Sequence, residues 1–332
     1  MPTLYGTKAL VTGAAGFIGS HLVERLLAEG AQVRAFLRYD SQNRIGHLAD
    51  MSADERDSVE IIRGDLKDPE AVGRAVHGAT MVFHLGALIA IPYSYQNPTD
   101  YVQTNVVGTQ HVLNACLKSG IERLVHTSTS EVYGTALRVP IALDHPRQAQ
   151  SPYSASKIAA DALVVSYARS FELPAVILRP FNTFGPRQSA RAVIPTIVRQ
   201  AIAGDSVRLG SIHPTRDFLY VSDTVNAFIA AGSSELPAGA EIQVGTGVET
   251  RIGDIVSMTG RILGKTLRIQ SDDHRVRPDT SEVERLLCDY SEAKRLTGWT
   301  PGVTFEDGLR RVIDYISTRT VAVSGSVHDY VV

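Results

Sequence analysis

The sequence predicts an α/β protein built on a parallel sheet with helices on both faces, and two patterns lead to this prediction. Short apolar runs typical of strands alternate with longer stretches in which apolar residues follow helical spacing. The strand runs also lack internal polar alternation, as expected for strands buried on both faces of a parallel sheet. Ligands of such sheets bind beyond the carboxyl ends of the strands, so we expect the functional site there.

Six apolar runs in the first 180 residues are the expected strands. They are Lys8–Thr12, Gln32–Leu37, Val59–Ile62, Met81–Leu85, Arg123–His126 and Ala175–Leu178. Helical spacing of apolar residues runs from Phe17 to Leu27 and again from Val102 to Leu113. The first of these stretches stops at Gly30 and the second at Gly120, and glycine commonly follows the end of a helix.

A glycine-rich turn directly follows the first expected strand and opens the first expected helix. Gly13, Gly16 and Gly19 are its glycines, and Phe17 and Ile18 begin the helix. Small residues let a pyrophosphate approach the backbone, and a helix N-terminus supplies N–H donors and a favourable dipole. The turn therefore predicts a dinucleotide site in a doubly wound sheet of the Rossmann type; a tight turn without a ligand is the alternative.

The ends of the next strands supply the other expected cofactor contacts. Asp65 is placed to accept from an adenine amino group, unless it is a simple turn aspartate, and Leu66, Leu85 and Ala87 complete the set. The end of the second strand lacks the acid that selects NAD, because the run reads Phe-Leu-Arg-Tyr before Asp40. Arg38, with Ser41 and Arg44, favours NADP slightly over NAD, although Arg38 stacked on adenine or facing solvent fits almost as well.

The length and composition bound the organisation of the chain. At 332 residues, 44% of them hydrophobic, the chain exceeds the ~250–300 residues at which one core stops growing. We expect a dinucleotide-binding domain over 1–179, with a short return at about 218–230. Frequent Pro and Gly predict a smaller substrate lobe over 180–320, followed by a tail at 321–332.

Charge and hydropathy exclude several classes of partner. The 33 Lys and Arg against 35 Asp and Glu give a net charge of −2, which offers no bulk attraction for nucleic acid or an anionic membrane. No apolar run approaches the ~18 residues of a membrane span, so a cytoplasmic protein is expected. Cys116 and Cys288 have no metal-type spacing, which predicts two buried thiols and no metal site.

Tyr153 and Lys157 stand four residues apart, one turn along the same face of a helix. A tyrosine acts as a base near neutral pH only if a nearby cation favours the phenolate, and Lys157 together with a nicotinamide cation is expected to lower its pKa in this way. The run after the fifth strand places Thr129 or Ser128 to hold the reacting oxygen and Glu131 to act as a second base. The alternatives are a chance Tyr-x-x-x-Lys spacing and a Glu131 that caps a turn or pairs with an arginine.

With these motifs in this order, the sequence resembles the extended short-chain dehydrogenase/reductases that act on nucleotide sugars, over residues 7 to 316. Thr129, Ser130 and Glu131 look like the catalytic run of the sugar-nucleotide 4,6-dehydratases. The segments 87–95, 150–157, 179–191 and 278–287 are similar to the N-acetylglucosamine-nucleotide 4,6-dehydratases of the legionaminic-acid type.

The resemblance implies a mechanism for this run of residues. Tyr153 takes the proton of the 4-hydroxyl, Glu131 takes the C5 proton, and the same nicotinamide cofactor receives and returns a hydride, which gives a 4-keto-6-deoxy sugar. Ser130 departs from the aspartate that many of these enzymes carry, so Glu131 is expected to serve the departing water as well.

The resemblance also implies substrate ligands and competing functions. Asn182, Arg216 and Arg277 are expected to hold the diphosphate, although Arg216 paired with Asp217 or Asp223 is an alternative. A UDP-glucuronate decarboxylase would need one more arginine, for which Arg187 and Arg191 are candidates. A nucleotide-sugar 4-epimerase and a non-catalytic dinucleotide-sensing regulator are competing functions as well.

The resemblance finally implies a homodimer. Helices at 102–117 and 151–171 are expected to pair with those of a second copy in a four-helix bundle. Exposed alanines, namely Ala159, Ala160 and Ala162, would allow a close approach.

Overall fold

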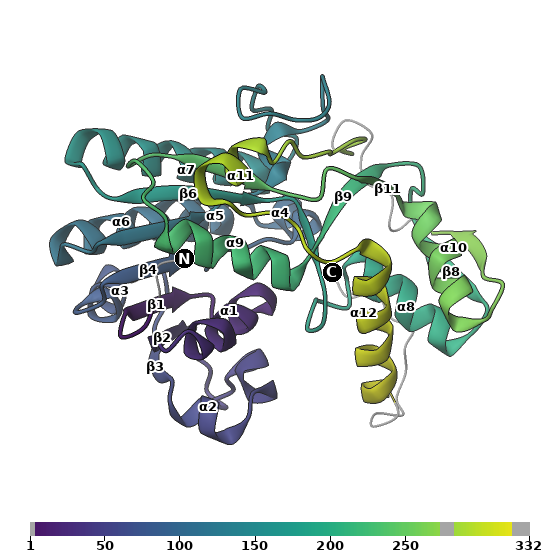
Figure 1. The fold of residues 1–332 in the computed structure, drawn as a ribbon, viewed down its shortest axis with the longest axis horizontal. Coiled ribbons are helices and arrows are strands. Elements are labelled where there is room, and N and C mark those ends of the chain that lie inside the picture. The colour runs from purple at the N-terminus through teal and green to yellow at the C-terminus, as the bar shows by residue number, and fades with distance from the viewer. Residues whose placement is uncertain (1–3, 273–281, 321–332) are drawn as a thin grey trace.

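A computed structural model describes residues 4–272 and 282–320, and it confirms the predicted fold class. Seven parallel strands form the central sheet in the order β10-β6-β5-β4-β1-β2-β3 (Figure 1). Their bounds are β1 Lys8–Thr12, β2 Gln32–Leu37, β3 Glu60–Arg63, β4 Met81–His84, β5 Arg123–Thr127, β6 Ala175–Pro180 and β10 Glu241–Val244. The strand order reverses between β1 and β4, where ligands of open α/β sheets bind.

Alternate residues of the strands face two separate hydrophobic layers. Leu10 of β1 packs on the side of α3, α6 and α7, whereas Val11 packs on the side of α1 and α9. The bounds of these helices are α1 Phe17–Ala28, α3 Pro69–Val76, α6 Gly108–Ser119, α7 Pro152–Phe171 and α9 Val221–Ser233. The sheet is thus covered on both faces, which explains why its strands show no polar alternation.

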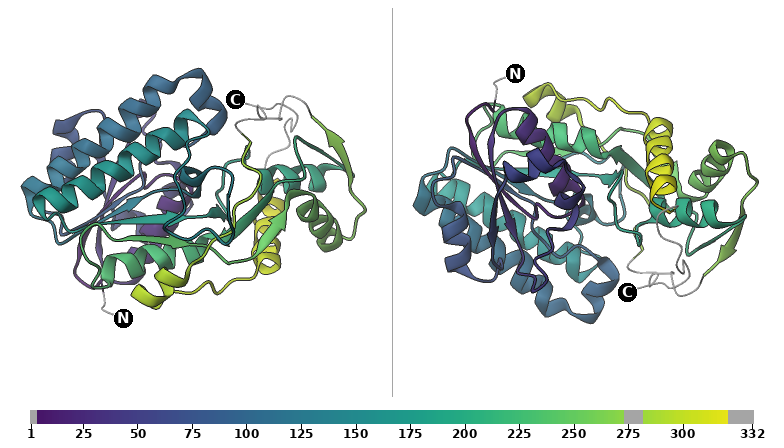
Figure 2. Two further views of the ribbon diagram at one scale, coloured as in Figure 1. Left: turned by 90° about the horizontal axis from the view of Figure 1, so that it is seen from above. Right: turned by 90° about the horizontal axis from the view of Figure 1, so that it is seen from below.

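The remaining elements lie mostly in the second half of the chain. One sheet has the order β11-β9-β7, and β8 pairs with β12. The strand bounds are β7 Asn182–Phe184, β8 Ser206–Leu209, β9 Thr215–Tyr220, β11 Glu249–Arg251 and β12 Arg268–Ser271. The helix bounds are α8 Val193–Ala203, α10 Ile252–Leu263, α11 Ser291–Thr297 and α12 Phe305–Thr320. Most of these elements gather on one side of the molecule, at the right in Figure 1 (see also Figure 2).

The chain returns to the central sheet after leaving it, through α9 and then β10. The boundaries predicted for the domains remain a prediction, because one hydrophobic core runs without a break from Val11 through Phe228 to Ile197 and Ile255. The tail expected at 321–332 lies outside the described residues.

Short helices lie in the connections between the larger elements. They are η1 Gly46–Asp50, α2 Ala53–Asp57, α4 Ile91–Gln96, α5 Pro98–Tyr101, the π-helical segment η2 Val102–Val107 and η3 Ser130–Tyr133. None of the helices in the described part of the chain combines the length and apolar character that crossing a bilayer requires. Cys116 and Cys288 are both buried and unpaired, as predicted.

Candidate functional site

The glycine-rich turn lies between β1 and α1, at the reversal point of the strand order. Gly13 has a φ of 71°, and a Cβ there would lie 2.9 Å from the backbone nitrogen of Gly86. A Cβ on Gly19 would lie 2.2 Å from the carbonyl oxygen of Gly13. Gly16 is the N-cap of α1 and no side chain caps this helix, so its first N–H groups point to a place where a phosphate would fit.

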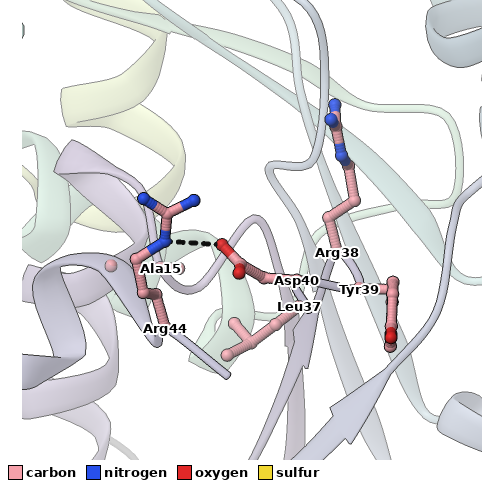
Figure 3. Close-up of a pocket in the computed structure, with 7 residues that line it drawn as sticks. Ala15, Leu37, Arg38, Tyr39, Asp40 and Arg44 are labelled. Atoms are coloured by element: carbon pink, nitrogen blue, oxygen red, sulfur yellow. Dashed lines mark hydrogen bonds and ion pairs between the residues drawn. The ribbon is translucent and has the colours of Figure 1, made fainter. Parts of the chain in front are cut away.

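A pocket of about 380 Å³ opens beside this turn, between the end of β2 and Ala15 (Figure 3). Arg44 donates from Nε to Asp40 Oδ2 at 2.8 Å, and Arg38 extends in another direction, as Figure 3 shows. Arg44 is therefore already paired with a carboxylate in the place where the sequence predicted two arginines around a 2′-phosphate. The pocket offers both a carboxylate for ribose hydroxyls and cations for a phosphate.

The ends of β3 and β4 complete this side of the site. Asp65 Oδ1 accepts from the backbone N–H of Lys67 at 2.9 Å, which is the turn-aspartate arrangement. The side chain of Leu66 packs against Gly86, the residue that follows Leu85 and precedes Ala87 in the sequence. The backbone N–H of Gly86 donates to Thr12 Oγ1 at 3.0 Å, so this segment is fixed to β1.

Tyr153 lies in the first turn of α7 with its side chain almost fully buried, in edge contact with Tyr101 at 6.2 Å between ring centroids. Burial raises the pKa of the Tyr153 phenol; a hydrogen bond with the Thr129 hydroxyl opposes this rise, and the charge of Glu131 adds to it. In the chain by itself desolvation outweighs the favourable contacts, and the lowering expected from Lys157 together with a nicotinamide cation stays a prediction.

Thr129 and Glu131 are positioned by the short helix η3 that follows β5. Thr129 is its N-cap, and its Oγ1 accepts from the backbone N–H of Glu131 at 3.3 Å. Ser130 is buried. Ser128, the alternative holder of the reacting oxygen, turns away and donates to Asp161 Oδ2 at 2.6 Å. The structure therefore brings Thr129, Glu131 and Tyr153 together and places Ser128 elsewhere.

Lys157 lies one turn after Tyr153 on α7, and only 4% of its surface is exposed. Its Nζ donates to the carbonyl oxygen of Thr127 at 2.5 Å. Burial lowers the pKa of Lys157 to about 8, Asp161 opposes this fall and Arg179 adds to it. The ammonium is thus the main form at neutral pH, but by a narrow margin.

Asn105 is a site residue that the sequence analysis missed. It lies in the π-helical segment η2, and its side chain bonds both backbone groups of Leu88, accepting from N at 2.8 Å and donating to O at 2.9 Å. The Asn105 amide also donates to the hydroxyl of Ser156, between Tyr153 and Lys157, at 2.9 Å. A lone asparagine in the apolar Val102–Val107 run was the available signal, and π-helical segments are frequent at functional sites.

A buried polar cluster behind Lys157 was missed as well. Asp161 and Arg179 are fully buried and form an ion pair at 2.8 Å, and His126 Nε2 lies 3.5 Å from Asp161 Oδ1. The signal was an aspartate four residues after Lys157, on the same helix face, with an arginine inside an apolar strand.

The predicted substrate residues are spread around the lobe side of the site. Asn182 begins β7, and its buried Oδ1 has no hydrogen-bond partner. Arg216 on β9 pairs with Glu282 at 3.2 Å rather than with Asp217 or Asp223. Arg191 is exposed and acts electrostatically on Tyr101, on the site side. Arg277 lies outside the described residues.

Arg187 is held against α1, the helix that the glycine-rich turn opens. Its guanidinium donates to Glu24 Oε1 of α1 at 2.5 Å and to the hydroxyl of Ser20 at 3.2 Å. Its side chain is 10% exposed, and Asp50 lies 3.6 Å from its Nε. Its role as a substrate ligand remains a prediction that would require these contacts to open.

The predicted dimer helices, α6 and α7, pack side by side on the outer face of the molecule (Figure 2). Ala162 is exposed and Ala159 is half-buried. Ala160 was expected to be exposed and is fully buried, because it lies on the same buried face of α7 as Ser156 and Val164. The homodimer stays a prediction.

The arrangement gathers two kinds of group at one edge of the sheet. Backbone N–H groups that could bind a dinucleotide lie directly after β1. A carboxylate lies after β5, and a phenol and an ammonium lie in the first turns of α7. The described residues hold no group of three or more His, Cys, Asp or Glu side chains that could bind a metal ion. Such a set can move protons to and from a substrate held beside a redox cofactor.

Comparison with known proteins identifies relatives over nearly the whole chain. A family profile described as GDP-mannose 4,6 dehydratase matches residues 10–312. A protein named UDP-glucose 4-epimerase from Mycolicibacterium smegmatis is 33% identical over 322 residues, which cover 94% of this chain and 99% of the relative. A dTDP-glucose 4,6-dehydratase from an Actinoplanes species is 32% identical over 316 residues, which cover 92% and 96%.

Solved structures agree with the sequence relatives. The dTDP-glucose 4,6-dehydratase from Streptomyces venezuelae, solved with NAD and TYD bound, superposes with a TM-score of 0.84 at 29% identity. This superposition covers 95% of the present chain and 98% of the other. The resemblance predicted from the sequence is confirmed at the level of this family, and the N-acetylglucosamine subgroup stays a prediction.

Proposed function

Because the chain belongs to the nucleotide-sugar dehydratase and epimerase family within the extended short-chain dehydrogenase/reductases, we propose that it catalyses NAD(P)-dependent 4,6-dehydration of a nucleotide-linked hexose. We propose N-acetylglucosamine as the sugar, on the similarity of segments 87–95, 150–157, 179–191 and 278–287 to that subgroup. The product is then a 4-keto-6-deoxy sugar nucleotide.

Glu131 is the residue that carries this proposal. Its charge acts on the Tyr153 phenol, so the carboxylate and the phenol belong to one site. A 4-epimerase needs one base at the 4-hydroxyl, whereas a dehydratase needs a second base for C5. A carboxylate beside the tyrosine therefore favours dehydration over epimerisation.

The residues of the glycine-rich turn suit a dinucleotide. Gly13 and Gly19 leave no room for a Cβ, Gly16 leaves little, and the uncapped N-terminus of α1 offers N–H donors for the pyrophosphate. Arg38 and Asp40 line the pocket that would hold the adenosine ribose, and Tyr153 and Lys157 would lie at the nicotinamide end. A nicotinamide cofactor, when bound, supplies the acceptor that takes up a hydride and later returns it. We keep a slight preference for NADP, on Arg38 and Arg44.

The residues of the chain then divide the proton transfers. Tyr153 removes the proton of the 4-hydroxyl while the Thr129 hydroxyl holds the same oxygen, and the ammonium of Lys157 favours the phenolate. Glu131 removes the C5 proton once C4 is a ketone. Glu131 then returns this proton to the departing 6-hydroxyl, because the neighbouring Ser130 is a poor acid. Reduction at C6 requires a new proton at C5, which comes from solvent, and Tyr153 releases the proton of the 4-hydroxyl to solvent in turn, so that the protons balance. Asn182 and Arg216, with Arg277 outside the described residues, hold the diphosphate and orient the sugar.

The test is mass spectrometry of reactions with UDP- and GDP-N-acetylglucosamine and with UDP-glucuronate. We expect a product lighter by one water from the N-acetylglucosamine nucleotide. In the Glu131→Gln variant, this product should form at least ~100-fold more slowly, since a positioned base contributes roughly that much. Tyr153→Phe should abolish the initial oxidation. Glu70→Gln, on the exposed first turn of α3, is the matched control and should retain the wild-type rate.

Epimerisation is the second candidate, because a relative at 33% identity carries the name UDP-glucose 4-epimerase. It predicts a product of unchanged mass with inverted configuration at C4, and Glu131→Gln would then leave the rate nearly intact. A decarboxylase would release carbon dioxide from the uronate. Loss of water at an unchanged rate from Glu131→Gln would show that the assigned base is wrong.

A further inference from the structure

We propose that Asp161 is a positioning residue that keeps the Lys157 side chain in its ammonium form and fixed to the end of β5. The proposal deepens the proposed function, because it concerns the lysine on which the phenolate of Tyr153 depends. The evidence is a cluster of buried polar side chains next to Lys157. These side chains come from α7 and from neighbouring strands of the central sheet.

Lys157 and Asp161 share one buried face of α7. Asp161 follows Lys157 by one helical turn, so both side chains lie on the sheet-facing side of α7, and both are buried. The ammonium donates to the carbonyl oxygen of Thr127, and the carboxylate accepts from the hydroxyl of Ser128, the next residue along the chain. Consecutive residues at the end of β5, Thr127 and Ser128, therefore anchor the two charged side chains.

The Asp161 carboxylate has hydrogen-bond donors on β6 and just after β5. Asp161 Oδ2 accepts from Ser128 at 2.6 Å and from Arg179 Nη2 at 2.8 Å. Its Oδ1 faces His126 Nε2 at 3.5 Å and has no hydrogen-bond partner. Because the carboxylate is buried from solvent, its negative charge acts on nearby cations through a medium of low polarity.

Titratable side chains of α7 and of three strands surround the ammonium within the described residues. Its own helix contributes Tyr153 and Asp161, β4 contributes His84, β5 contributes His126, and β6 contributes Arg179. Burial lowers the pKa of both histidines, to about 4 for His126, so they are neutral near pH 7. Asp161 is thus the one anion in this shell of described residues at neutral pH, opposed by a single cation, Arg179.

Beyond this shell, Arg179 has a second anchor, which makes the test practicable. Its guanidinium also pairs with Glu241 of β10 at 2.8 Å, and Glu241 is held in turn by Arg147. Removing the charge of Asp161 therefore leaves Arg179 with a carboxylate partner, so the variant avoids an unpaired buried cation.

The experiment follows the Lys157 side chain by NMR of protein labelled with [ε-13C]lysine, with Lys157→Arg to assign the resonance. We expect the wild-type lysine to titrate near pH 8. In Asp161→Asn the midpoint should fall by about 1 pH unit or more, which is a ~10-fold loss of ammonium at alkaline pH. Asp161→Glu should restore the wild-type midpoint, and Asp254→Asn, an exposed aspartate of α10, should leave it unchanged.

A double variant keeps the test decisive if Asp161→Asn does not fold. Asp161→Asn with Arg179→Met removes both charges of the pair, and Glu241 keeps Arg147. The midpoint should then lie below that of Arg179→Met alone, because these two proteins differ only in the charge of Asp161. An unchanged midpoint in Asp161→Asn, or equal midpoints in the double variant and Arg179→Met, would overturn the proposal.

A second readout separates this proposal from the proposed function. The alkaline limb of the pH profile of dehydration should move down by the same amount as the NMR midpoint in Asp161→Asn. A shifted NMR midpoint in a protein that releases no water from any substrate would refute the proposed function and support the role of Asp161. Dehydration with an unmoved midpoint would do the reverse.

Discussion

Replacing Asp217 with Ala is expected to destabilise the fold by about 2–4 kcal/mol. Asp217 lies on β9 and is fully buried, and its carboxylate accepts four hydrogen bonds. The donors are Thr246 N at 2.7 Å, Thr246 Oγ1 at 2.7 Å, Gly247 N at 2.9 Å and Cys288 N at 3.2 Å. This one side chain thus ties together three segments that are distant in sequence.

The magnitude follows from what happens to each donor. Thr246 and Gly247 are partly or fully exposed, so water replaces much of what they lose. The N–H of Cys288 is buried and stays unsatisfied, at a cost of about 1–3 kcal/mol. Burial raises the pKa of Asp217 in spite of its four donors, so removing the charge also recovers part of its desolvation penalty. Because these effects oppose each other, the net loss of unfolding free energy is well below the cost of losing four full hydrogen bonds.

Urea unfolding followed by circular dichroism measures this loss. The free energy of unfolding should fall by about 2–4 kcal/mol at an unchanged m-value, and Asp254→Ala, at an exposed position, should change it by about 0.5 kcal/mol or less. A loss below about 1 kcal/mol for Asp217→Ala would refute the reasoning, because it would mean that the four hydrogen bonds merely offset the burial of the charge.

Two further predictions concern the cofactor turn and the buried histidines. Gly19→Ala should weaken binding of NAD or NADP at least ~10-fold by titration calorimetry, because its Cβ would meet the Gly13 carbonyl at 2.2 Å; Gly73→Ala, with open space around it, should bind normally. The pKa of His126 is lowered to about 4, so the unfolded chain binds more protons between about pH 6.5 and 4, and stability should fall by on the order of 1 kcal/mol per pH unit as the solution is acidified through this window. His126→Gln should flatten this slope in unfolding experiments, and an unchanged slope would assign the acid sensitivity to other groups.

Local patterns in the sequence were sufficient for the fold class and for much of the site. The predicted strands Lys8–Thr12 and Gln32–Leu37 match β1 and β2 residue for residue, since each is an apolar run bounded by turn residues. The glycine-rich turn and the Tyr153–Lys157 pair were also predictable, because each depends on spacings of only a few residues. Strand β10 was missed, because its four residues Glu241–Val244 show little pattern of their own and their partner β6 lies some sixty residues earlier.

Contacts between distant segments decided the rest. Ser128 and Thr129 are adjacent and chemically alike, and only the packing of β5 against α7 turns one toward Asp161 and the other toward Tyr153. Arg187 carries the charge of a substrate ligand, yet Glu24 of α1, 163 residues away, holds it in an ion pair. The burial that raises the pKa of Tyr153 and lowers that of Lys157 is likewise a property of the assembled core. The sequence alone therefore determined which elements and reactive groups this protein has, through short-range periodicity, whereas tertiary structure decided which groups meet and in what protonation state, because desolvation and pairing arise only when distant elements pack together.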